Sequence, residues 1–104
     1  MNPADQLRYL LALAIAKRIR TSPEDAEKAI RKIRANIGKL IAKGMHTEGD
    51  AEWLALLDHK NPVEIAGILE DKSHESQRLR SNLRGHGIIS NEERLQIIRN
   101  VNGL

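Results

Sequence analysis

Residues 9–16, YLLALAIA, decide the fold of this 104-residue chain. The run has no charged residue, and at about 100° per residue its side chains cover the whole circumference of a helix with apolar groups. Such a helix is buried on several sides or lies at a subunit interface. Asn2 and Pro3 supply a cap and a first-turn proline before it. We therefore predict a central core helix that ends at about Arg20, where basic residues suit the helix dipole.

The next segment begins with the strongest helix-start signal in the sequence. Ser22 is a cap, Pro23 takes the first helical position and two acids follow it. The helix should continue to Lys43, because Gly44 is a typical helix stop. Apolar residues at a 4-3-4-3 spacing form its packing seam: Ala26, Ile30, Ile33, Ile37 and Leu40. The sequence predicts a long helical hairpin over residues 1–45, and the same seam is compatible with a homodimer.

Shorter helices are expected over residues 46–104. The first of them should start at Thr47 or Asp50, run to about Asp58 and bury Trp53 against the hairpin. The last should start at a capping box that begins at Ser90. Its expected buried side consists of Leu95, Ile98 and Val101, and the capping box pairs Ser90 with Glu93.

Composition supports packed helices in one domain. Hydrophobic residues make up 40% and charged residues 30% of the chain, which is an ordinary globular balance. The core must be aliphatic, because the chain has one Trp, one Tyr and no Phe. No run shows the alternation of a strand. We predict a single all-α domain of about six helices, spanning residues 1–104.

Residues 61–89, NPVEIAGILEDKSHESQRLRSNLRGHGII, have the outline of a helix-turn-helix. A short helix over 62–70 is followed by a polar break and a basic helix over 74–84, which Ser73 caps. With Leu79 and Leu83 facing inward, the opposite face of this second helix is formed by His74, Gln77, Arg78, Ser81 and Arg84. Arg and Gln carry paired hydrogen-bonding groups that match base edges in the major groove.

This stretch resembles the helix-turn-helix and winged-helix DNA-binding families in the order and spacing of Glu64-Ile65-Ala66, Leu69, Leu83 and Gly87-Ile88-Ile89. The resemblance covers roughly a quarter of the chain and implies a small DNA-binding regulator whose second short helix contacts duplex DNA. The DNA contacts expected from this region are Gln77, Arg78, Arg80, Ser81 and Arg84. Two short amphipathic helices joined by a polar turn are, equally, ordinary architecture in helical proteins without DNA binding.

A row of lysines lies on one face of the second predicted helix, opposite its apolar seam. It consists of Lys28, Lys32, Lys39 and Lys43. Such a row suits the phosphate backbone of duplex DNA, with affinity that depends on salt rather than on base sequence. It is also typical of a solvated helix face.

Charge is distributed in three blocks. Residues 1–45 have ten Lys or Arg and four acids, residues 46–71 have one Lys and seven acids, and residues 72–104 have six Lys or Arg and three acids. The blocks can pair with each other, or they can present complementary surfaces to a partner. The alternative function is therefore a small adaptor or inhibitor, of the phage or plasmid accessory type, that binds a protein without binding nucleic acid. Its expected surface is acidic: Glu48, Asp50, Glu52 and Asp58.

No pattern of catalysis is present in the sequence. His46, His59, His74 and His86 fit no metal-site spacing, there is no Cys, and no serine has the context of a nucleophile. We expect no enzyme activity, no cofactor and no metal. The start of the chain shows no signal-peptide pattern, and no apolar run approaches the ~20 residues of a membrane span, so we expect a cytoplasmic protein without membrane contact.

Overall fold

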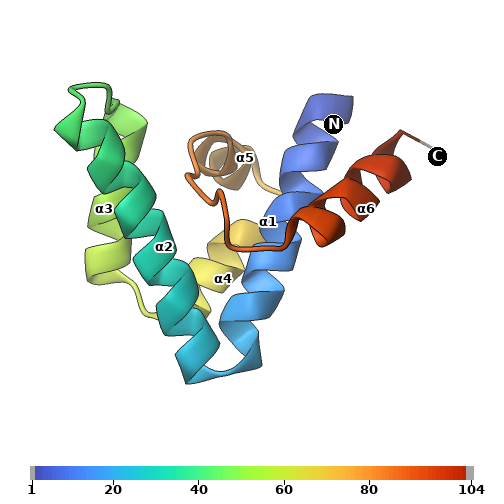
Figure 1. Ribbon diagram of the computed structural model, residues 1–104, viewed down its shortest axis with the longest axis horizontal. Helices are drawn as coiled ribbons and strands as arrows, with labels where there is room; N and C mark the ends of the chain where they lie inside the picture. Colours follow the sequence, from blue (N-terminus) through green and yellow to red (C-terminus); the bar gives the residue numbers. More distant parts are fainter. Residues whose placement is uncertain (1, 103–104) are drawn as a thin grey trace.

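Six helices form the fold over residues 2–102, which the computed structural model describes (Figure 1). They are α1 (Pro3–Thr21), α2 (Pro23–Ala42), α3 (Glu48–His59), α4 (Pro62–Glu70), α5 (His74–Ser81) and α6 (Asn91–Val101). No strand occurs among these residues. The predicted all-α class with six helices in one compact domain is confirmed.

Local capping chemistry sets where the helices begin. Asn2 accepts a hydrogen bond from the Asp5 backbone N–H at 2.8 Å, and Ser22 caps α2 in the same way. Thr47 and Asp50 form a complete capping box at the start of α3. Each of these starts agrees with the sequence prediction, because a cap is formed by residues only three positions apart.

The C-terminal end of α2 is closed by a glycine in the left-handed region. Gly44 has a φ of 67° and donates its N–H to the Ile41 carbonyl, while the Met45 N–H donates to the Leu40 carbonyl at 2.8 Å. This is the Schellman arrangement, in which two unpaired helix carbonyls gain partners. The helix therefore ends at Ala42, one residue before the predicted Lys43.

The core is built around α1. This helix contacts α2, α4, α5 and α6, and its side chains Ala12, Ile15, Ala16 and Ile19 are buried. In Figure 1, α1 and α2 meet at the bottom of the view and diverge upward, with α4 and α5 between them. The predicted hairpin is thus an open one, and α4 fills it with Ile65, Ala66 and Leu69, all fully buried. Small alanines on α1 and α4 suit this close approach.

Trp53 joins α3 to α5. Its ring is fully buried, as predicted, and its Nε1–H donates to the Leu79 carbonyl at 2.8 Å. That carbonyl lies near the end of α5, and it also accepts from the Asn82 N–H. The Ser81 hydroxyl donates to the neighbouring Arg78 carbonyl at 2.6 Å. The helix α5 ends at Ser81, so the predicted extension to residue 84 is wrong.

The last helix packs on α1 but has no fully buried residue. Leu95, predicted to be buried, is 42% exposed, and Ile98 and Val101 are only half-buried. Ser90 caps α6 as predicted, but the Glu93 carboxylate does not complete a capping box. It lies instead 3.3 Å from the guanidinium of Arg18 on α1. None of the helices within residues 2–102 is both long and apolar enough to cross a membrane.

Candidate nucleic-acid interface

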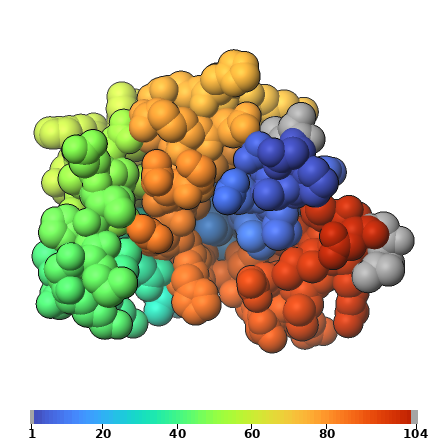
Figure 2. Space-filling model, turned by 90° about the horizontal axis from the view of Figure 1, so that it is seen from above, coloured from blue at the N-terminus to red at the C-terminus, as the bar shows by residue number. Residues whose placement is uncertain are grey.

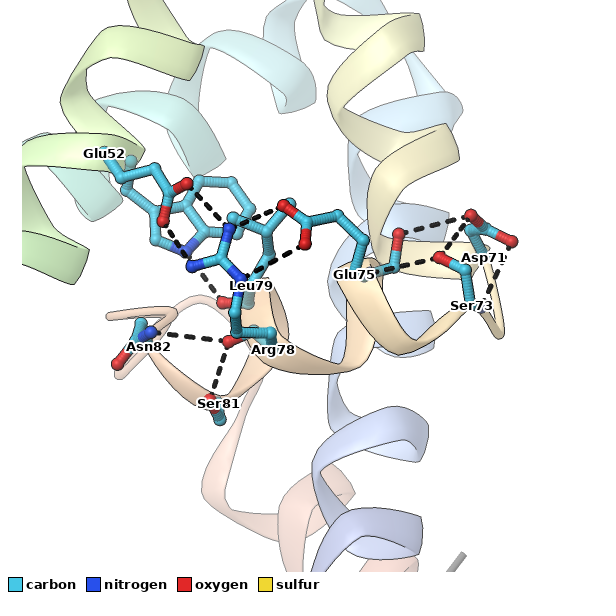
Figure 3. A network of polar contacts seen from close by, with 10 residues as sticks. Glu52, Asp71, Ser73, Glu75, Arg78, Leu79, Ser81 and Asn82 are labelled. Atoms are coloured by element: carbon cyan, nitrogen blue, oxygen red, sulfur yellow. Dashed lines mark hydrogen bonds and ion pairs between the residues drawn. The ribbon is translucent and has the colours of Figure 1, made fainter.

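Arg78 is the exposed arginine of α5, and two carboxylates of the chain hold it (Figure 3). Its Nη1 and Nη2 each donate to the Glu52 carboxylate of α3 at 2.8 Å, and its Nε donates to Glu75 at 3.2 Å. The hydrogen bonds from Arg78 lower the pKa of both Glu52 and Glu75, so both stay ionised. The side chain predicted to read a base edge is thus at the surface, but its hydrogen-bonding groups are engaged within the fold.

Two further predicted contacts on α5 have different environments. Ser81 is exposed, as the helical projection predicts, and its hydroxyl donates to the Arg78 carbonyl in the last turn of α5. Gln77 is half-buried, because its amide donates to Asp5 of α1 at 3.0 Å. The prediction that Gln77 faces outward is therefore wrong, since it lies at the contact between α5 and α1.

Arg80 is buried and cannot reach a duplex. Only 5% of the residue is exposed, and its guanidinium lies over the Tyr9 ring, 4.7 Å from the ring centroid. Its Nη1 donates to the Leu69 and Asp71 carbonyls at the C-terminal end of α4. The cation thus meets the negative end of a helix dipole and an aromatic face. Its assignment as a DNA contact is corrected: Arg80 is a structural residue.

Arg84 lies in the loop after α5 rather than on the helix, and its partner is Asp50. Its Nε and Nη2 donate to that carboxylate at 2.8 and 3.2 Å. The Asp50 side chain is 1% exposed, so the prediction that it belongs to an acidic surface is wrong. Hydrogen bonds from Arg84, and then from Thr47, hold the pKa of Asp50 below its usual value despite burial. The Arg84 side chain is 38% exposed, but its charge is committed to this pair.

Ion pairs also connect the three charge blocks of the sequence. Two more acids of the 46–71 block pair with arginines of the first helices: Arg34 with Asp58 at 2.8 Å and Arg20 with Glu70 at 2.7 Å. Every ion pair between different helices or loops within residues 2–102 uses an arginine. The planar fork of arginine suits such bidentate contacts with carboxylates better than the single ammonium of lysine. The charge blocks therefore pair largely within the fold.

The lysine row consists of Lys28, Lys32, Lys39 and Lys43, and three of the four are exposed to solvent. All four lie on α2 or its C-cap, within about 60° around the helix axis and over a length of about 22 Å. Lys28, Lys39 and Lys43 are exposed. Lys28 is 3.9 Å from Glu24 of its own helix, and the other three ammonium groups have no carboxylate within 4.0 Å among the described residues.

The loop after α5 borders this row, which the sequence did not indicate. Asn36 of α2 donates to the Arg84 and His86 carbonyls at 2.8 and 2.9 Å and so holds the loop against α2. Gly87 has a φ of 86°, and a Cβ there would lie 2.8 Å from the Lys32 Cε. The Lys32 stem therefore packs on this glycine, which explains why Lys32 is half-buried.

The described residues contain no group of three His, Cys, Asp or Glu side chains placed to hold a metal ion. Comparison with known proteins gives no family assignment. No protein-family model matches the chain, and no curated protein and no solved structure is significantly similar to it. The functional argument therefore depends on the geometry of the charged surfaces.

Proposed function

We propose that this protein binds duplex DNA through the lysine row of α2, which contacts the phosphate backbone. One observation carries the proposal: arginines neutralise the acids inside the fold, while a 22 Å row of lysines remains without cross-helix partners. Ammonium groups on flexible stems suit phosphate contacts, which displace condensed counterions and supply affinity without base preference. The protein would act as a small DNA-associated regulator.

In this proposal α4 and α5 support the fold rather than read bases. Arg78 would have to leave both Glu52 and Glu75 to contact a base edge, and those carboxylates would then face the phosphates. A lysine on α2 has no such competitor. We therefore expect binding with little preference among duplex sequences.

The test is fluorescence anisotropy with a labelled mixed-sequence duplex at several salt concentrations. The variant carries Lys28→Gln, Lys39→Gln and Lys43→Gln, and it spares Lys32 because that stem packs on Gly87. We expect the slope of log K against log salt to become shallower by up to about 2.7, because each phosphate contact contributes about 0.9.

A matched control carries Lys60→Gln, Lys72→Gln and Arg99→Gln. These residues are exposed and lie outside the row, and their substitution removes the same number of positive charges as the test variant. The control should keep nearly the parent slope, since only local contacts release counterions. Equal losses in the two variants would show a general effect of net charge and refute the lysine row as the interface. Absence of binding at low salt would remove DNA binding altogether and favour the protein-binding adaptor or inhibitor.

A further inference from the structure

A recess of about 430 Å³ lies where α1, the loop after α5 and the start of α6 meet. In Figure 2 these elements, coloured blue, orange and red, surround a hollow with α1 at its floor. The volume falls within the range of pockets that hold small organic molecules. The recess is separate from the exposed lysines of α2, none of which lines it.

The floor and the walls of the recess differ in chemistry. Leu11 and Ile15 of α1 form an apolar floor with Leu83 and Ile89 of the loop. No Asp or Glu lines the recess. The charged groups that do so are all basic: Arg8, Arg80 and Arg94. An apolar floor beneath basic groups suits a ligand with an apolar body and an anionic head.

The arginines at this recess are incompletely paired. Arg94, in the first turn of α6, has no ion pair with any residue of the described range 2–102. Arg8 uses one Nη for Asp5, at 3.1 Å, and its side chain remains 50% exposed. Arg80 is buried without a carboxylate partner, and its Nη2 has no hydrogen-bond partner among the described residues. The positive charge of this region is therefore only partly compensated: Arg8 has one carboxylate partner, Arg80 has backbone carbonyls, and Arg94 has neither an ion pair nor a helix-end carbonyl among the described residues.

The acid next to Arg94 in the sequence is held away from the recess. Glu93, one residue before Arg94, does not line it, and its carboxylate lies 3.3 Å from Arg18. The recess also includes Asn91 at the N-terminal end of α6, where the helix dipole adds positive potential. The charge and the shape of the recess thus both favour a ligand with an anionic head and an apolar body.

We infer that this recess binds a small amphiphilic anion, whose carboxylate or phosphate head group contacts Arg94 and Arg8 and whose apolar body lies on Leu11, Ile15 and Leu83. This site does not depend on the proposed DNA binding, because its residues and those of the lysine row are varied separately. The two proposals can therefore fail independently.

The test is a titration of the ¹⁵N-labelled protein, followed in ¹H–¹⁵N spectra, with decanoate and decyl phosphate below their micelle concentrations and with decanol below its solubility limit. Both anions should shift the backbone amide signals of Gly85 and Gly87, which line the recess. Decanol has the same apolar chain without the charge, so we expect it to bind at least about tenfold more weakly, as a charge-assisted hydrogen bond predicts.

Arg94→Gln and Arg99→Gln form the matched pair for this test. Both residues are exposed on α6, but only Arg94 lines the recess. We expect about a tenfold loss of decanoate affinity for Arg94→Gln and no change for Arg99→Gln, with unchanged far-ultraviolet circular dichroism in both. Equal binding of decanol and decanoate, equal affinity of the two variants, or an absence of shifts at Gly85 and Gly87 would each overturn the inference.

Discussion

Replacing Trp53 with alanine is expected to lower the free energy of unfolding by about 4 kcal/mol, the largest effect of any single substitution considered for this chain. The ring is fully buried in the core, so its removal leaves a cavity in addition to the lost apolar burial. The Leu79 carbonyl also loses the Nε1–H donor at 2.8 Å. The total free energy of unfolding of a domain of this size is roughly 5–15 kcal/mol, so the variant should be close to unfolding at 37 °C.

Urea unfolding followed by circular dichroism measures this effect without relying on the tryptophan signal. Trp53→Phe is the matched control, because it keeps most of the apolar volume while it removes the hydrogen bond. We expect a loss of about 1–2 kcal/mol for Trp53→Phe. A loss below about 1 kcal/mol for Trp53→Ala would contradict the full burial of the Trp53 ring.

Asp50→Ala is expected to cost about 3 kcal/mol, the second largest effect. The substitution removes the capping box with Thr47 and leaves the Arg84 guanidinium without its partner. Because the Arg84 side chain is 38% exposed, water compensates part of that lost pair. Glu48→Ala is the control, since Glu48 is exposed in the same helix turn, and it should change stability by at most about 0.5 kcal/mol.

This contribution of Asp50 should depend on pH. The Arg84 guanidinium lowers the folded-state pKa of Asp50 below its unfolded value. Stability from this group is therefore fully present above the unfolded pKa of about 4 and is lost as the pH falls through the folded pKa. Urea midpoints measured from neutral pH downward should show the gap between parent and Asp50→Ala narrowing only below about pH 4. A gap that is constant over the whole range would show that Asp50 does not titrate with folding.

The sequence by itself determined where the helices begin and which of them is the core helix of this protein. Caps such as Asn2 and Ser22, and the stop at Gly44, act within a few residues, so a local pattern contains all the information. The apolar circumference of residues 9–16 required burial on several sides, and α1 is indeed the helix that contacts four others. The lysine row was also visible in the sequence, because residues on one solvated helix face follow from helical periodicity alone.

Only the tertiary structure decided what the arginines do. Arg78, Arg80 and Arg84 have the same local character in the sequence, yet one is held at the surface by Glu52, one is buried over Tyr9 and one pairs with buried Asp50. Their partners are distant in the chain: Asp50 lies 34 positions before Arg84. Tertiary structure likewise decided the partner of Trp53, whose Nε1–H donates to the Leu79 carbonyl 26 positions away. Helical periodicity places a side chain on a face, but which group meets that face depends on how the helices pack.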